Sequence, residues 1–231
     1  YSFEPSEEQK MLVEAVSKYA ASDLRAKARE AEEENGLPPA LVQKGWELGY
    51  LQASIPEEYG GFGERSAVTG VLAAEELAYG DLAGALAVMA PGLFAVPILM
   101  AGTDEQKKTY LPMVAEADRW AAFTAALIES SFDFDPTALK TLASEEGSDY
   151  VLQGEKVFVP FGEQAEAMIV YAGLEGRTQG FIVPKDSKGL VVEERQKLLG
   201  IHALPVHKVC FNSVRVPKKN RLGGAEGHDF Q

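Results

Sequence analysis

Two pairs of adjacent glutamates, Glu57-Glu58 and Glu75-Glu76, are the side chains whose types and spacing first suggest chemistry. Neighbouring carboxylates can serve as a general acid and a general base when their pKa values differ. The surroundings favour a structural role, because the first pair precedes a Tyr-Gly-Gly turn and the second lies in a helical run. We therefore expect loop or helix-face acids, with the second pair partly buried in helix packing.

The other reactive residue types are too sparse for a metal site or a disulfide. The three histidines, His202, His207 and His228, have no ligand spacing to one another or to Cys210. A single cysteine cannot close an internal disulfide, which fits a reducing compartment. The first residues are acidic and form no basic signal-peptide region. We predict no metal ligand and a cytoplasmic location.

The composition is that of a globular chain with an acidic surface: the net charge is -13, with 46% hydrophobic and 25% charged residues. Nucleic acids and anionic membranes bind basic faces, so we expect neither as a partner. Residues 82–101 contain no charged side chain, a length that could span a bilayer. Their many small residues, Pro91, Pro97 and the lack of a basic flank favour the buried centre of a helical domain, where neighbouring helices or a ligand approach closely.

The first half of the sequence carries helix signals. Ser6 to Gln9 and Thr103 to Gln106 are capping boxes, and Ser66 is a further N-cap. We expect the first helix to stop after the acidic run at 30–34, with Gly36 in the left-handed conformation. Pro38-Pro39 should open the second helix, and the helix after Thr103 should end before Pro112 or soon after it.

The second half carries strand signals from about Trp120 onward. The β-rich runs, separated by turn residues, are Ala121–Ile128, Leu139–Ala143, Tyr150–Val159, Ala167–Ala172, Gly180–Val183, Leu190–Glu194 and Val206–Val216. Seven short strands predict a barrel or a sandwich. We therefore predict an α+β chain, with a helical domain at residues 1–116 and a β-barrel domain at residues 117–231.

Eight segments in a fixed order give the sequence a resemblance to the flavin-dependent acyl-CoA dehydrogenase family. They are Leu37–Pro39, Pro56–Gly61, Glu75–Leu77, Gly102–Lys107, Tyr110–Pro112, Tyr150–Lys156, Leu199–Ile201 and Val214–Pro217. The resemblance implies an N-terminal helical domain and a middle β-barrel. It also implies α,β-oxidation of an acyl-CoA thioester by FAD. The family's catalytic carboxylate lies in a C-terminal helical domain, so no residue of this chain is assigned as catalytic.

The resemblance also implies partners and site residues. Family members form oligomers, so a homo- or hetero-oligomer is expected, with an electron-transfer flavoprotein as a possible electron acceptor. By position, the cofactor residues are Leu127, Ile128, Asp133, Phe134, Phe158, Val159 and Pro160. By the same transfer, the acyl thioester contacts Glu129, Ser130 and Phe134.

Several of these positions depart from the family pattern. Ile128 replaces a threonine that bonds the flavin ring, Asp133 replaces a glycine, and Phe134 replaces a serine. Pro160 replaces a threonine that contacts the ring and has neither a hydroxyl nor an N–H. Phe158 keeps the aromatic wall. Two interpretations stay open: a flavin enzyme with altered cofactor contacts, or a flavin-free subunit that acts as a scaffold or binds acyl thioesters.

Overall fold

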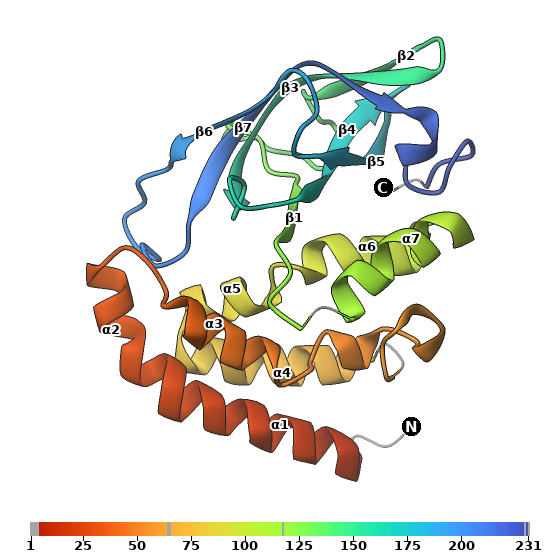
Figure 1. The fold of residues 1–231 in the computed structure, drawn as a ribbon. Helices are drawn as coiled ribbons and strands as arrows, with labels where there is room; N and C mark the ends of the chain where they lie inside the picture. Colours follow the sequence, from red (N-terminus) through yellow and green to blue (C-terminus); the bar gives the residue numbers. More distant parts are fainter. Residues whose placement is uncertain (1–4, 64–65, 117, 229, 231) are drawn as a thin grey trace. The chain divides into compact units, whose positions relative to one another are not determined.

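The computed structural model describes residues 5–63, 66–116, 118–228 and 230 (Figure 1). The chain divides into two compact units. Unit 1 comprises Tyr1–Met89, Pro112–Ala121 and Lys197–Leu204, and unit 2 comprises Ala90–Leu111, Ala122–Gln196 and Pro205–Gln231. This grouping places one helix and most of a second with the strands. The predicted domain division at residues 116/117 stays a prediction.

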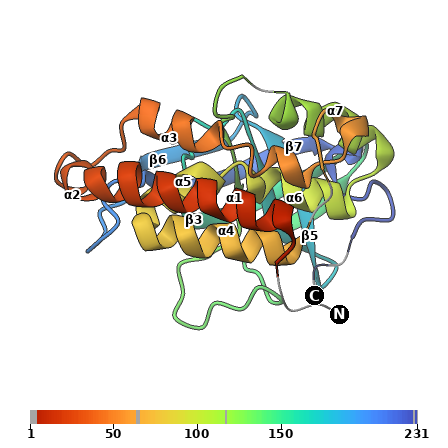
Figure 2. The ribbon, with the colours of Figure 1, turned by 90° about the horizontal axis from the view of Figure 1, so that it is seen from below.

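Unit 1 is built from helices. They are α1 (Glu7–Tyr19), the π-helical turn η1 (Ala20–Leu24), α2 (Arg25–Glu33), α3 (Pro39–Trp46), the 3-10 turns η2 (Gln52–Ser54) and η3 (Glu57–Tyr59), α4 (Ala67–Gly80) and α5 (Leu82–Met89). Figure 2 shows α1 lying along α4, and Gln9 Nε2 donates to Thr69 Oγ1 at 2.9 Å between them. The α1, η1 and α2 segments follow one another without a break, so the first predicted helix is confirmed as one continuous rod with a π-helical turn.

The helix ends follow the sequence signals, with one correction. Both reciprocal bonds of the capping box between Ser6 and Gln9 are present, and the Ser66 side chain accepts the Thr69 N–H. The left-handed residue after α2 is Asn35, with φ of 56°, and not Gly36 as predicted. Asparagine tolerates this conformation because its short amide bonds locally, here to the Glu33 carbonyl at 3.4 Å.

The core of unit 1 depends on a close approach at Gly45. A Cβ at this position would lie 2.5 Å from Val88 Cγ2 and 2.8 Å from the Tyr19 hydroxyl. The Tyr19 hydroxyl donates to the Leu41 carbonyl at 2.8 Å, so its polar end is paired inside the core. Glycine is therefore required for α3 to reach its neighbours.

The paired glutamates lie at the surface of unit 1. Glu57 and Glu58 are exposed on η3, as is Glu75 on α4. Only Glu76 is partly buried, so the burial predicted for the second pair holds for one of its two members. A turn and a helix surface are the places where adjacent acids can stay solvated at little cost.

Unit 2 contains α6 (Gly92–Ala101), α7 (Asp104–Ala115) as far as Leu111, and the strands. The strands are β1 (Phe123–Ala126), β2 (Leu142–Glu146), β3 (Asp149–Pro160), β4 (Ala167–Leu174), β5 (Arg177–Pro184), β6 (Leu190–Arg195) and β7 (Val206–Pro217). Each of the predicted strands has its counterpart, and a short 3-10 turn, η4 (Lys218–Asn220), follows β7. The capping box at Thr103 is present, and α7 continues through Pro112 for one more turn.

The strands form one sheet that curls on itself (Figure 1). Its order is β1-β4-β2-β3-β7-β6, and β5 pairs with β4. β1 runs parallel to β4, whereas β3, β7 and β6 are antiparallel. Leu152, Phe181 and Phe211 are fully buried within the curl. A helical part followed by a curled sheet confirms the predicted α+β class.

The uncharged run at residues 82–101 forms α5 and α6, which Pro91 separates. Among the residues that the structure describes, no single helix has both the length and the apolar content needed to cross a membrane. The bent pair of α5 and α6 would pass that test together on length and composition alone. Ala83, Ala87 and Val88 of α5 are buried in unit 1, as predicted for a helix at the centre of a domain.

Candidate functional site

Unit 2 contains a pocket of about 430 Å³ that is lined by α6, β1, β3 and β4 and by the segment after β1. Its lining residues are Gly92, Leu93, Val96, Pro97, Ala125, Leu127, Ile128, Val157, Phe158, Pro160 and Tyr171. Four of the predicted cofactor residues are among them, namely Leu127, Ile128, Phe158 and Pro160. Two segments that are about thirty residues apart in the sequence thus meet at one pocket.

The other predicted cofactor and substrate residues lie outside this lining. Val159 is buried in the sheet core. Asp133 and Ser130 are exposed on the segment between β1 and β2, and Phe134 there is partly buried. A hydrogen bond from the Ser131 side chain lowers the pKa of the Asp133 carboxyl, which stays on the surface 3.8 Å from Lys140 Nζ. The binding roles predicted for these residues stay predictions.

The pocket walls are almost entirely apolar. Among the lining side chains, all within the described residues, only Tyr171 carries a polar group, and burial raises the pKa of its hydroxyl to about 12. Pro160 has no N–H, and the Phe158 N–H donates to Gln196 Oε1 at 2.7 Å. These walls fit the flat faces of a flavin ring. Their side chains do not fit the hydrogen-bonding edge of that ring, which needs several partners.

Phe158 reaches the pocket through an irregularity in β3. The β3–β7 register shifts between Lys156 and Val159, and Phe158 has a φ of 54°. A left-handed conformation costs a bulky residue about 1–2 kcal/mol. The bond from its N–H to Gln196 holds this conformation, and 45% of the Phe158 surface stays exposed. The regular β3–β7 pairing is thus interrupted at the position where the Phe158 ring lines the pocket.

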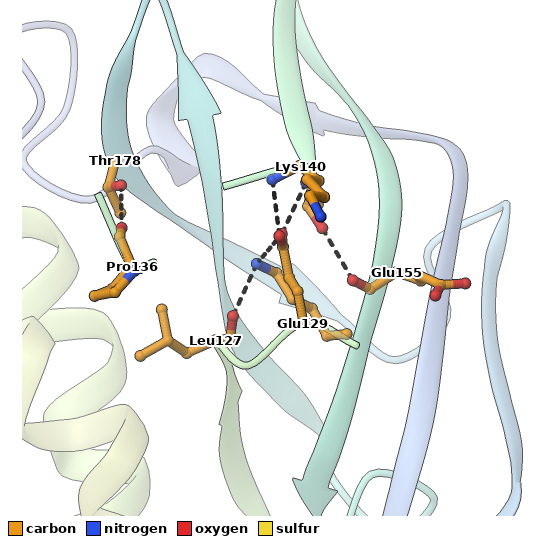
Figure 3. A network of polar contacts seen from close by, with 8 residues as sticks. Leu127, Glu129, Pro136, Lys140, Glu155 and Thr178 are labelled. Carbon is orange, nitrogen blue, oxygen red and sulfur yellow. Dashed lines mark hydrogen bonds and ion pairs between the residues drawn. The ribbon is translucent and has the colours of Figure 1, made fainter. Parts of the chain in front are cut away.

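A buried ion pair between Glu129 and Lys156 lies next to Leu127, a residue of the pocket lining, and Figure 3 shows the network around Glu129 and Leu127. Lys156 Nζ lies 2.8 Å from Glu129 Oε1, and the two side chains are 0% and 7% exposed. The same ammonium donates to the Leu127 carbonyl at 2.9 Å. The two Glu129 oxygens also accept the N–H groups of Lys140 and Thr141, each at 2.8 Å. The carboxylate thus joins both ends of the segment between β1 and β2.

The electrostatics of this pair follow from its hydrogen bonds. Burial alone would raise the pKa of the Glu129 carboxyl, but the bonds from Lys156, Lys140 and Thr141 outweigh it and hold that pKa below its ordinary value. Burial lowers the pKa of the Lys156 ammonium, and the bond to Glu129 offsets part of this. The substrate contact predicted for Glu129 stays a prediction, whereas its bonds within the chain are structural.

Part of this site was not predicted from the sequence. Lys156 was named only within the segment Tyr150–Lys156 that carries the resemblance, although a lysine directly before the apolar run Val157–Val159 was a signal for a buried charge with a partner. No role was predicted for Tyr171 or for the α6 wall, although the small residues there were expected to let a ligand approach. Within the described part of the chain, no group of three or more His, Cys, Asp or Glu residues could hold a metal ion.

Comparison with known proteins covers both parts of the chain. Residues 6–118 match the family model "Acyl-CoA dehydrogenase, N-terminal domain", and residues 124–214 match "Acyl-CoA dehydrogenase, middle domain". Short-chain specific acyl-CoA dehydrogenase from Rattus norvegicus mitochondria is 31% identical over 228 residues, which cover 96% of this chain and 55% of the relative. The chain spans about half the length of the curated relatives that it matches.

Two solved structures share the fold over 96% of this chain. A glutaryl-CoA dehydrogenase from Mycobacterium smegmatis in complex with FADH2 has a TM-score of 0.83 and 28% identity, with 56% of that chain covered. A chain from work on the electron transferring flavoprotein of Acidaminococcus fermentans has a TM-score of 0.83 and 31% identity, with 60% covered. The similarity includes both the helices and the curled sheet.

Proposed function

Because this chain belongs to the acyl-CoA dehydrogenase family, we propose that the whole protein oxidises the α,β bond of an acyl-CoA thioester with a bound flavin. The observation that carries the proposal is the pocket of unit 2, which brings together Leu127, Ile128, Phe158 and Pro160. A flavin supplies the electron sink for such an oxidation. Binding of FADH2 by a similar dehydrogenase supports this cofactor.

In this proposal the chain holds the flavin mainly by its faces. Phe158 and the aliphatic walls provide apolar contact, and Tyr171 provides the one polar side chain of the lining. Backbone groups must serve the remaining polar edge. No residue of this chain is proposed as the base that removes the α-proton. The base, the electron acceptor and the oligomer are proposed for the whole protein and not for residues of this chain.

A second candidate is a flavin-free protein that binds acyl thioesters or serves as a scaffold beside a competent homologue. The specific observation in its favour is the shortage of donors: Pro160 offers none, and the Phe158 N–H is already used by Gln196. A wall that is apolar apart from Tyr171 suits an acyl chain, which needs burial and no hydrogen bonds. Exposed Asp133 also disfavours a nearby phosphate through like charge.

The partners follow from the first proposal. An acyl-CoA thioester is the substrate, and an electron-transfer flavoprotein is the proposed acceptor, in line with the Acidaminococcus structure that this chain resembles. We also propose that the protein is a homo- or hetero-oligomer and acts in the cytoplasm in fatty acid metabolism.

The visible absorption spectrum of the full-length protein tests the first proposal against the second. After incubation with FAD and desalting, we expect a flavin band close to one per subunit, and bleaching of that band on addition of acyl-CoA. A folded, colourless protein that still binds acyl-CoA in a calorimeter would contradict the first proposal and support the second. A folded protein that binds neither would contradict the first proposal and the acyl-thioester-binding form of the second, and would leave the scaffold role.

Restoring polar contacts should strengthen flavin binding. We expect Pro160→Thr combined with Phe134→Ser to lower the Kd for FAD by about 5- to 150-fold, since each of two recovered hydrogen bonds contributes about 0.5–1.5 kcal/mol. Fluorescence titration of FAD with the full-length protein measures this change. Thr124→Ser, at a buried residue outside the pocket lining, is the control and should leave the Kd unchanged. An unchanged Kd in the double variant would show that these positions do not limit binding.

A further inference from the structure

The Glu129–Lys156 pair is connected to both sides of the pocket wall. Lys156 Nζ bonds the Leu127 carbonyl, and the next residue of β3, Val157, donates its N–H to the Ile128 carbonyl at 2.8 Å. Two consecutive carbonyls of the pocket segment are therefore directed toward β3. Because the peptide bonds are trans, the Ile128 N–H points away from Lys156. The Lys156 ammonium and the Val157 N–H are thus the two donors to this backbone.

The same pair also fixes the segment that leads away from the pocket. The Glu129 carboxylate accepts hydrogen bonds from the backbone N–H groups of Lys140 and Thr141, so the two ends of the segment from residue 129 to residue 141 are held together. Thr141 Oγ1 in turn donates to the Glu155 carbonyl at 3.0 Å, next to Lys156 (Figure 3). The network closes the segment at its base and joins it to β3.

Burying the charges of Glu129 and Lys156 costs desolvation energy, and water compensates little of it because the two side chains are 7% and 0% exposed. Buried pairs of this kind are often replaceable by apolar residues without loss of stability. Their remaining advantage is geometric, because a charged carboxylate with several donors and an ammonium with two acceptors tolerate few arrangements. Here the observed arrangement is the one in which Leu127 and Ile128 line the same pocket as Phe158.

We propose that Glu129 and Lys156 act as one positioning clamp for the pocket, setting the backbone orientation of its Leu127–Ile128 wall through their hydrogen bonds within the chain. The clamp rests on the proposed function only in that the pocket is taken as the ligand site. It differs from a purely structural pair, since it predicts that ligand affinity and stability respond differently to substitution.

The test uses the full-length protein with Lys156→Met and with the neutral pair Glu129→Gln/Lys156→Met. We expect both variants to weaken binding of FAD and of acyl-CoA at least tenfold, measured by titration calorimetry. Stability should separate them: the double variant removes the unpaired carboxylate and should unfold at higher urea than Lys156→Met. Lys185→Met breaks the exposed Lys185–Glu166 pair of the same unit and should change neither affinity nor stability.

A reporter in the pocket tests the clamp without any ligand. In a Phe158→Trp background, we expect the clamp variants to shift the emission of the introduced tryptophan to longer wavelength and to raise its quenching by acrylamide. The emission of Trp46 and Trp120 is subtracted with the spectrum of the matching protein that retains Phe158. Recovery of affinity together with stability in the double variant, or an unchanged reporter, would overturn the clamp. Failure of every protein to bind ligand, with a shifted reporter, would overturn only the proposed function.

Discussion

Replacing Lys156 by methionine is expected to lower the free energy of unfolding by about 3–5 kcal/mol, as is usual when one partner of a buried ion pair is lost. The substitution leaves the Glu129 carboxylate buried with two backbone donors and no positive charge. It also removes the donor of the Leu127 carbonyl. Since folded proteins are stable by about 5–15 kcal/mol, this is a large part of the total.

The measurement is urea unfolding of the full-length protein followed by far-ultraviolet circular dichroism. Hydrogen exchange adds a local readout, because the Thr141 and Val157 amides bond directly within this network and should exchange faster. A loss below about 1 kcal/mol would place Lys156 in the class of surface pairs, in conflict with its complete burial.

Glu129 should give this stability a dependence on acid pH. Its folded pKa lies below the ordinary value near 4.3, so its contribution is fully present above that value and is lost as the pH falls through the folded pKa. We expect the cost of Glu129→Gln to be largest near neutral pH and to shrink as the pH falls below about 4. Urea midpoints of both proteins across this range check the sign, and a cost that grows toward acid would contradict it.

The parts of the fold that the sequence predicted are those with local causes. The capping boxes at Ser6 and Thr103 depend on residues three apart, and the strands follow runs of β-branched residues between turns. The prediction that Gly36 adopts the left-handed conformation was wrong for a local reason too. Asparagine and glycine both accept a positive φ, and the sequence alone does not rank them at one position.

The parts that escaped prediction depend on contacts between distant residues. Glu129 and Lys156 are 27 residues apart, and nothing in either local sequence names the partner. The register shifts in β3 bury both Lys156 and Val157, so simple alternation cannot tell which side chains face inward. Four of the positions predicted from the resemblance, Leu127, Ile128, Phe158 and Pro160, do line the pocket. They lie in or beside this irregular stretch, where the path of the backbone matters more than the residue type.

The position of α6, which forms one wall of the pocket, depends on the packing of Phe94. This side chain is 0% exposed, stacks on Phe123 at a centroid distance of 4.7 Å, and meets Tyr110 edge-on at 5.7 Å. All three rings belong to unit 2, so they join α6 and α7 to β1. Leu93 and Val96 on α6 line the pocket, and Phe94 holds the helix that carries them.

Replacing Phe94 by alanine is expected to lower the free energy of unfolding of unit 2 by about 3–5 kcal/mol, through lost burial, a cavity and two lost ring contacts. Urea unfolding with hydrogen exchange of the α6 amides measures it in the full-length protein. Phe94→Leu is the matched control and should cost less, because it keeps most of the buried volume. A small cost with unchanged α6 exchange would mean that α6 is held to the sheet by other contacts. Faster exchange of the α6 amides, with unchanged exchange of the strand amides, would show that the helix joins the sheet through these rings. One wall of the pocket would then depend on them.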